Sequence, residues 1–410
     1  MINYRGRDFE LVKVFRNGTD RVCTPAETLS RIRPHFDAAG LTRLANITGL
    51  DRVGIPVVLS VRPNSFYLAV DAGKGHDLSA AKASAAMETF ERSIAETSNS
   101  ESFRAAYDDV HGRCAVIAPE QLPLVRDGVL SRRWHYRWTI GWDIANSVEI
   151  AVPTVRVTLP PPRALPQDLG TFLWDSNGLA SGNSLLEAIC SGLTEVIERD
   201  AITCTKAAML NTGYIPPLLR LETVTDPISL EAINRFRAAG IAVVAVDCTN
   251  DIGVATYWVK IYDTIDENIG VYGGYGAHLN PAIALSRALH EAAQSRLVYI
   301  AGARDDMFKK DFIRLKRARA PATVRSMTET RPVVDFSSRP SLASEAFDLD
   351  IGVMIDRLRC RGLHQVIVYD FPNALDVSVV RVIVPGLEGY MSELYQPGAR
   401  AAAFAARTSS

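Results

Sequence analysis

The chain has 410 residues and a formal net charge of −1, because 45 Lys and Arg residues nearly balance 46 Asp and Glu residues. Apolar residues make up 47% of the sequence, which is enough for a large core, and the length allows one to three domains. A net charge near zero gives no electrostatic reason to expect nucleic acid or a membrane as a partner, and no apolar run is long enough to span a bilayer.

The six cysteines are scattered without a Cys-x-x-Cys pair, and the first residues lack the apolar segment of a signal peptide. We therefore expect a reduced, cytoplasmic protein whose cysteines are small buried residues. Cys190 directly precedes one of the motifs described below. We expect its side chain to point away from that motif, which argues against a nucleophilic role.

Apolar periodicity predicts helices that alternate with strands along the chain. The expected helices are, in chain order, 25–33, 79–97, 185–209, 229–239, 281–301 and 344–361. The stretch 132–142 alternates aromatic and other residues. Basic residues among aromatics can bind single-stranded nucleic acid, but period two favours a strand with one aromatic face in the core.

Two of the expected helices end at a glycine, Gly240 or Gly362, and each leads into two β-branched strands. These strands are expected at 241–247, 254–261, 366–370 and 377–384. The repeat predicts an α/β fold with pseudo-symmetric halves, in which helices flank mixed sheets.

No clear boundary divides the chain, because 159–166 and 316–331 look like surface loops within one unit. We expect residues 1–60 to form an N-terminal segment packed on a core unit of residues 61–400. Residues 401–410 would be a C-terminal tail.

The phrase Ser-x-x-x-Glu-x-x-Glu-Arg occurs twice, each time nine residues after a glycine. The two copies are Ser84, Glu88, Glu91 and Arg92 after Gly75, and Ser191, Glu195, Glu198 and Arg199 after Gly182. Positions i, i+4 and i+7 of a helix share one face, so the Ser and both Glu residues form a polar stripe.

A third helix carries a weaker version of this stripe. Asn280 and Pro281 give it an N-cap and a proline at the first helical position. Glu291 and Gln294 then share one face, and Arg296 follows one position later than the corresponding Arg residues. The three helices are expected to line one cleft.

Acidic residues on core helices repel one another unless cations hold them, and Mg²⁺ prefers oxygen ligands and bridges to phosphates. The alternative is that each motif only makes surface ion pairs, but the repetition favours a site. Glycines near the helix starts, at 73–75, 182 and 273–276, favour an anion at backbone N–H groups. Ser184 and Glu187 also fit a capping box, so a purely structural role stays open there.

On these three motifs the chain resembles the YcaO family of ATP-dependent peptide-modifying enzymes. The resemblance implies that ATP and Mg²⁺ lie between the repeated acidic helices. Its implied metal ligands are Glu88, Glu91, Glu195, Glu198 and Glu291. Its implied nucleotide contacts are Lys74, Ser84, Arg92, Asn183, Ser184, Glu187, Arg199 and Arg296, and its implied catalytic residues are Arg199, Gln294 and Arg296.

Members of this family activate a backbone amide of a peptide by phosphorylating its oxygen after a nucleophile has added to the carbonyl. A neighbouring Cys, Ser or Thr side chain gives an azoline, an external sulfur source gives a thioamide, and an amine gives an amidine. Many azoline-forming members end in Pro-x-Pro-x-Pro, whereas this chain has Pro397 to Arg400 followed by an Ala-rich stretch.

The segments Phe15 to Arg21 and Pro385 to Glu388 look like members associated with TfuA proteins. The resemblance therefore implies thioamide formation on a peptide or protein substrate, with a TfuA-like partner that delivers sulfur or activates the enzyme. Azoline cyclodehydration and a non-catalytic ATP-binding scaffold remain as alternatives. The oligomeric state stays open, with a homodimer among the alternatives.

Overall fold

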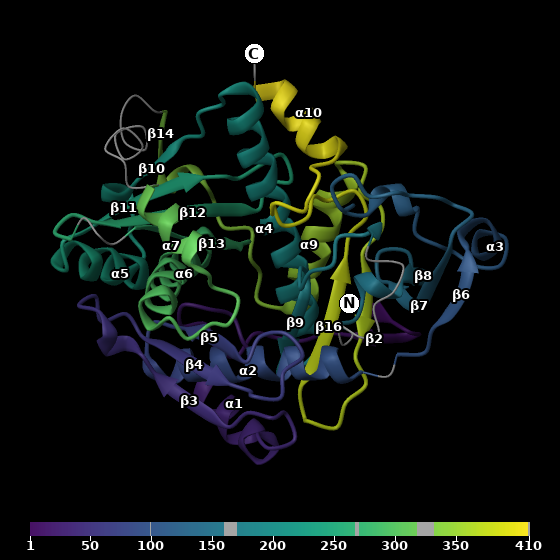
Figure 1. Ribbon diagram of the computed structural model, residues 1–410, viewed down its shortest axis with the longest axis horizontal. Helices are drawn as coiled ribbons and strands as arrows, with labels where there is room; N and C mark the ends of the chain where they lie inside the picture. Colours follow the sequence, from purple (N-terminus) through teal and green to yellow (C-terminus); the bar gives the residue numbers. More distant parts are fainter. Residues whose placement is uncertain (99, 160–169, 267–269, 318–331, 409–410) are drawn as a thin grey trace.

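The computed structural model describes residues 1–98, 100–159, 170–266, 270–317 and 332–408 (Figure 1). Its strands are β1 Ile2–Tyr4, β2 Arg7–Phe9, β3 Arg43–Asn46, β4 Val57–Val61, β5 Val70–Lys74, β6 Phe103–Ala106, β7 His135–Asp143, β8 Val148–Pro153, β9 Leu179–Gly182, β10 Leu218–Arg220, β11 Ile241–Asp247, β12 Ala255–Asp263, β13 Val271–His278, β14 Val333–Asp335, β15 Ile367–Asp370 and β16 Ser378–Ile383.

The helices are α1 Pro25–Ile32, α2 Leu78–Thr97, α3 Tyr107–His111, α4 Leu185–Thr212, α5 Pro227–Ala238, α6 Pro281–Ala301, α7 Lys309–Arg317, α9 Phe347–Arg359 and α10 Ala399–Thr408. The predicted helices are confirmed with small shifts at their ends. The Asn280 side chain accepts a hydrogen bond from the Ala282 N–H, which confirms the predicted N-cap of α6.

The strands form several mixed or antiparallel sheets, as the sequence predicts. The five-stranded sheet has the order β13-β12-β11-β10-β14, the six-stranded sheet has the order β6-β7-β15-β16-β9 with β8 also paired to β7, and the three-stranded sheet has the order β3-β4-β5. The β10–β14 pair is parallel, whereas the β11–β12 and β12–β13 pairs of the same sheet are antiparallel.

Each of the three acidic helices follows a strand and packs on it: α2 follows β5, α4 follows β9, and α6 follows β13 (Figure 1). Glycines in the strands permit this packing. A Cβ atom added at Gly73 would lie 2.0 Å from Ala85 N, and one at Gly274 would lie 2.2 Å from Ala292 N. A side chain at either position would collide with the helix backbone.

The prediction that the glycines at 73–75 and 273–276 form loops before the helices is therefore wrong except for Gly75, which lies between β5 and α2. Gly73 lies within β5, and Gly273, Gly274 and Gly276 lie within β13. Strand-to-helix contact explains why glycine stands at these positions. Their spacing before the helices reflects packing of the repeated unit.

The second predicted repeat is present as α5–β11–β12 and α9–β15–β16, in which each helix is followed by an antiparallel strand pair. Gly240 and Gly362 adopt φ values of +65° and +76°, the left-handed conformation that favours glycine after a helix.

Residues 135–142 of the aromatic stretch lie in β7, in which Tyr136 and Trp138 are fully buried and His135 and Arg137 are exposed, whereas Trp134 precedes the strand and is exposed. This alternation confirms the strand and its buried aromatic face. Tyr136 and Trp138 belong to a core cluster that also includes Phe90 of α2 and Ile367 of β15.

The predicted division at residues 60 and 400 remains a prediction. Residue 60 lies within β4, which pairs with β5, and residues 401–408 belong to α10, which packs on α4. The surface loops expected at 159–166 and 316–331 fall largely on 160–169 and 318–331, outside the described residues. Within the described ranges, no helix is both long and apolar enough to cross a bilayer.

Candidate active site

A cavity of about 880 Å³ lies where α2, α4 and α6 come together, and glutamates from all three helices line it. These are the five residues named from the sequence: Glu88, Glu91, Glu195, Glu198 and Glu291. A second cavity of about 290 Å³ adjoins it and shares Lys74, Ser84, Glu88, Glu91 and Glu195. The structure therefore brings the three acidic stripes together, as their spacing predicts.

Arg287 is a cavity residue that the sequence reasoning missed. It lines both cavities and lies one helical turn before Glu291 on α6. Arg287, Glu291 and Gln294 have the same i, i+4, i+7 spacing as Ser84, Glu88 and Glu91. Aligning the third helix at the position of the serine would have found it.

Basic side chains lie among the glutamates. Arg92 Nε is 2.8 Å from Asp71 Oδ1 and 3.2 Å from Glu88 Oε1. On α4, Arg199 Nη1 is 3.3 Å from Glu198 Oε1. Lys74 Nζ, at the end of β5, is 3.1 Å from Glu291 Oε2. Each acidic helix therefore has a cation from this chain at the cavity wall.

These cations do not fully offset the burial of the carboxylates. Burial raises the pKa of Glu195 to about 7, with Arg199 acting in the opposite direction. Burial, together with the charges of Glu88 and Glu195, raises the pKa of Glu91 well above its usual range. For Glu291, burial is outweighed by Lys74 and Arg199, which hold its pKa below the ordinary value.

The donor set fits Mg²⁺ together with phosphates. In the part of the chain that the structure describes, no three His, Cys, Asp or Glu side chains are grouped to hold one ion by themselves. Protein-bound Mg²⁺ typically uses one or two carboxylates and completes its shell with water and phosphate oxygens. The raised pKa of Glu195 and the buried Oδ2 of Asp71, which has no hydrogen-bond partner, both indicate room for added positive charge.

Asn183 and Glu187 line the smaller cavity, but their polar groups already bond within the protein. Glu187 is buried and accepts hydrogen bonds from Val22 N at 3.0 Å and from Asn183 Nδ2 at 3.0 Å. Asn183 Oδ1 accepts from Arg31 Nη2 at 2.8 Å. Ser184 caps α4 by accepting from Glu187 N at 3.3 Å and lies outside both cavities.

The structure separates the two polar residues predicted at the end of the third motif. Gln294 lines the large cavity, and its Nε2 donates to the Ala72 carbonyl oxygen of β5. Arg296 is buried outside both cavities, 3.0 Å from Asp51 Oδ2 and 3.0 Å from Asp263 Oδ2. The structure therefore does not bring Arg296 to the predicted phosphate contact.

Further residues line the large cavity without having been assigned to it from the sequence, among them Asp71, Arg304, Asp306 and Tyr390. Burial raises the pKa of Asp71 to about 7, although Arg92 opposes this shift. Arg304 Nη2 pairs with Asp306 Oδ2 at 2.5 Å. The place of this pair at the cavity depends on the tertiary fold, which sequence proximity does not show.

Cys190 and His290 do not act as exposed reactive groups. Cys190 belongs to an apolar cluster, and burial raises the pKa of its thiol to about 12. Burial lowers the pKa of His290 to about 4, and its Nδ1 is 2.7 Å from the Ser286 carbonyl oxygen. The burial of Cys190 confirms the packing role expected from the sequence, whereas Cys114 and Cys360 are exposed, so the expectation of buried cysteines is wrong for these two.

Known proteins resemble this chain over most of its length. A family model described as YcaO cyclodehydratase, ATP- and Mg²⁺-binding, matches residues 72–388. An uncharacterised protein in the tfuA 3′ region of Rhizobium leguminosarum bv. trifolii is 38% identical over 398 residues, covering 93% of this chain and 92% of that protein. A protein of Methanothermobacter thermautotrophicus is 36% identical over 387 residues, covering 92% and 97%.

Two solved structures share the fold. YcaO from Methanopyrus kandleri bound with AMPPCP and Mg²⁺ has a TM-score of 0.73 at 24% identity, covering 95% of this chain and all of that one. A heterocyclase in complex with substrate and cofactor has a TM-score of 0.76 at 22% identity, covering 92% of this chain and 54% of that one.

The fold and the acidic cavity thus define an α/β enzyme of the ATP- and Mg²⁺-dependent, peptide-modifying class. The chain belongs to the YcaO family.

Proposed function

We propose that this protein uses ATP and Mg²⁺ to replace the oxygen of a peptide or protein backbone amide with sulfur. The observation that carries the proposal is the meeting of five glutamates from three repeated strand–helix units at one cavity, with Lys74, Arg92 and Arg199 beside them. Phosphoryl transfer needs this combination of metal-binding carboxylates and cations.

The bound nucleotide supplies the phosphoryl group, and Mg²⁺ neutralises phosphate charge. Glu88, Glu91, Glu195, Glu198 and Glu291 are proposed to hold the metal. Arg92 and Arg199 would keep their charge at any physiological pH and orient phosphate oxygens. Lys74 and Ser84 line both cavities, so they would contact the nucleotide where the cavities join.

The amide would react in two stages. Hydrosulfide adds to the carbonyl carbon, and the oxyanion formed there takes the γ-phosphoryl group of ATP with release of ADP. Hydrogen phosphate then leaves with the former carbonyl oxygen and the proton of the added sulfur, as the C=S bond forms. The net change consumes one amide, one hydrosulfide ion and one ATP, and yields one thioamide, ADP and hydrogen phosphate.

The sulfur source is proposed to be an external donor delivered with a TfuA-like partner. The support is the relative in the tfuA 3′ region, which is 38% identical to this chain, and the segments 15–21 and 385–388 that resemble TfuA-associated members. The partner would present sulfide to the large cavity.

Azoline formation is the second candidate, favoured by the cyclodehydratase description of the family model and by the structural likeness to a heterocyclase. In that reaction the nucleophile is a Cys, Ser or Thr side chain next to the amide, and the peptide loses water overall. The two products therefore differ in the sign of the mass change.

The test uses the purified protein with ATP, Mg²⁺ and sulfide. The substrate is a peptide extract from a strain of the source organism in which the gene for this protein has been deleted. Mass spectrometry should find peptides in which sulfur replaces oxygen, and the Glu195→Gln variant should produce none. Loss of water in place of the sulfur gain would select the azoline reaction. Binding of ATP without any peptide change, also after a TfuA-like protein is added, would support a scaffold and contradict the proposal.

A further inference from the structure

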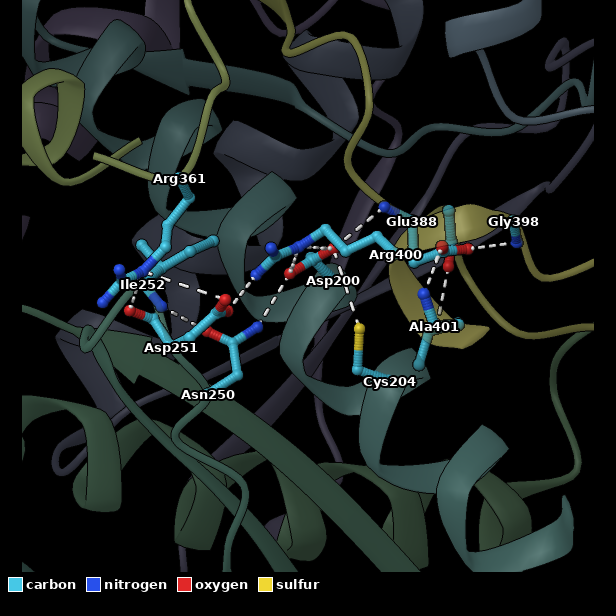
Figure 2. A network of polar contacts seen from close by, with 12 residues as sticks. Asp200, Cys204, Asn250, Asp251, Ile252, Arg361, Glu388, Gly398, Arg400 and Ala401 are labelled. Carbon is cyan, nitrogen blue, oxygen red and sulfur yellow. Dashed lines mark hydrogen bonds and ion pairs between the residues drawn. The ribbon is translucent and has the colours of Figure 1, made fainter. Parts of the chain in front are cut away.

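The chain after β16 closes over α4 through a buried group of polar contacts (Figure 2). Asp200, the residue after Arg199, is fully buried. Its two carboxylate oxygens both accept from Arg400 Nε at 2.8 Å. Oδ1 also accepts from the backbone N–H of Glu388 at 3.0 Å, and Oδ2 accepts from Asn250 Nδ2 at 2.7 Å.

The Glu388 carboxylate makes the other hydrogen bonds of this group. Its buried carboxylate accepts from the Tyr395 hydroxyl at 2.5 Å, from Gly398 N at 2.8 Å and from Ala401 N at 2.7 Å (Figure 2). The last two N–H groups belong to the start of α10, where a carboxylate is favoured. The side chain of Glu388, at one end of the segment 388–398, thus binds the backbone at the other end.

Tyr390 lies inside this closed segment and lines the large cavity. Its ring centroid is 5.4 Å from Arg199 Cζ, and the ring of Tyr275 is 5.7 Å from the same atom. The Arg199 guanidinium, which also pairs with Glu198, is therefore flanked by aromatic contacts. One of those contacts comes from Tyr390, which lies within the segment 388–398.

We infer that residues 388–401 are a positioning element of the nucleotide site, in which Glu388, Asp200 and Arg400 pin the segment that places Tyr390 against Arg199. The inference gives a structural role to Glu388, the last residue of the segment 385–388. It rests on the proposed function only where it assigns Arg199 to a nucleotide phosphate. Asp200, Glu388 and Arg400 are positioning residues, and Tyr390 lines the site.

The role of Glu388, Asp200 and Arg400 in holding the segment 388–398 is tested first, without nucleotide, by amide hydrogen exchange of the full chain. Arg400→Gln leaves Asp200 buried without its cation, so amides in 388–398 should exchange about tenfold faster or more. Arg361→Gln is the matched control. Arg361 bonds to the Asp251 carbonyl oxygen at 2.7 Å and lies 3.8 Å from Asp251 Oδ2, so this variant removes a neighbouring Arg whose contacts are with Asp251 and not with Asp200 or Glu388. Unchanged exchange in Arg400→Gln would overturn the inference.

The effect on the site is tested by calorimetry with a non-hydrolysable ATP analogue and Mg²⁺. Tyr390→Ala should weaken binding about fivefold, whereas Tyr390→Phe, which keeps the ring, should bind as the original protein does. Equal affinity in all three proteins would overturn the role of Tyr390, even if Arg400→Gln failed to fold. Failure of the original protein to bind the analogue would instead contradict the proposed function. Hydrogen exchange would still show whether Arg400 holds the segment 388–398 in place.

Discussion

At the scale of single residues, the same residue type serves opposite purposes in the three motifs. Arg92 and Arg199 lie at the cavity beside Glu88 and Glu198, whereas Arg296 is buried between two aspartates. A one-position shift along α6 turns the side chain away from the stripe, because successive residues of a helix point about 100° apart. Arg296 therefore supports the fold.

Replacing Arg296 with Met should lower the free energy of unfolding by about 3 kcal/mol or more, because it leaves Asp51 and Asp263 buried without their shared cation. Nucleotide affinity of the folded fraction should stay unchanged. Urea unfolding and calorimetry together check this. A stable variant that no longer binds the nucleotide would restore the phosphate role predicted from the sequence.

Asp370, at the end of β15, gives a prediction for pH. Burial raises its pKa to about 6, with Arg5 opposing the shift, so the native state holds this proton more tightly than the unfolded state. The contribution of the protonated Asp370 carboxyl group to the stability of the native state is therefore complete below the unfolded pKa of about 4. It is lost as the pH rises through about 6.

Asp370→Asn, which cannot ionise, should accordingly raise the melting temperature at pH 7.5 relative to the original protein. The difference should shrink as the pH falls through about 6 and should be smallest below about 4, where Asp370 is protonated in both states. Melting curves across this range are the measurement. A variant that is less stable at pH 7.5 would mean that the charged carboxylate is needed there.

At the scale of elements, the strand–helix unit β5–α2, β9–α4 and β13–α6 is what brings the acids together. The sequence shows the stripe of each helix, because periodicity is local. It does not show why glycines precede the helices. Gly73 and Gly274 serve close packing of helix on strand, a tertiary contact that resembles a phosphate loop in the sequence.

Gly274→Ala should strongly destabilise the protein, because the new Cβ atom would lie 2.2 Å from Ala292 N and 2.4 Å from the Ala288 carbonyl oxygen. Gly352→Ala is the matched control. Gly352 lies inside α9 with open space around it, so the change should stabilise the protein by about 0.5–1 kcal/mol. Thermal unfolding of the two variants decides, and a Gly274→Ala protein as stable as the original would contradict the packing account.

At the scale of the whole molecule, the α/β class, the two internal repeats and the five converging glutamates were predictable from local patterns. The cavity residues that were missed come from segments far apart in the chain. Asp71 precedes α2, Tyr390 follows β16, and Arg304 follows α6, so only the tertiary fold assembles them. The burial of Glu187 and Arg296 likewise depends on distant partners such as Val22 and Asp51.

The central claim is that the cavity between α2, α4 and α6 binds ATP through Mg²⁺ held by glutamates. The most direct measurement is calorimetric titration of a non-hydrolysable ATP analogue, with Mg²⁺ and with the metal removed by a chelator. Glu195→Gln and Glu198→Gln should abolish the Mg²⁺-dependent binding without unfolding the protein. Glu231→Gln, an exposed residue of α5 paired with Arg235, should leave it unchanged. The account predicts binding that requires Mg²⁺ and both cavity glutamates, and equal affinity without the metal or in both cavity variants would contradict it.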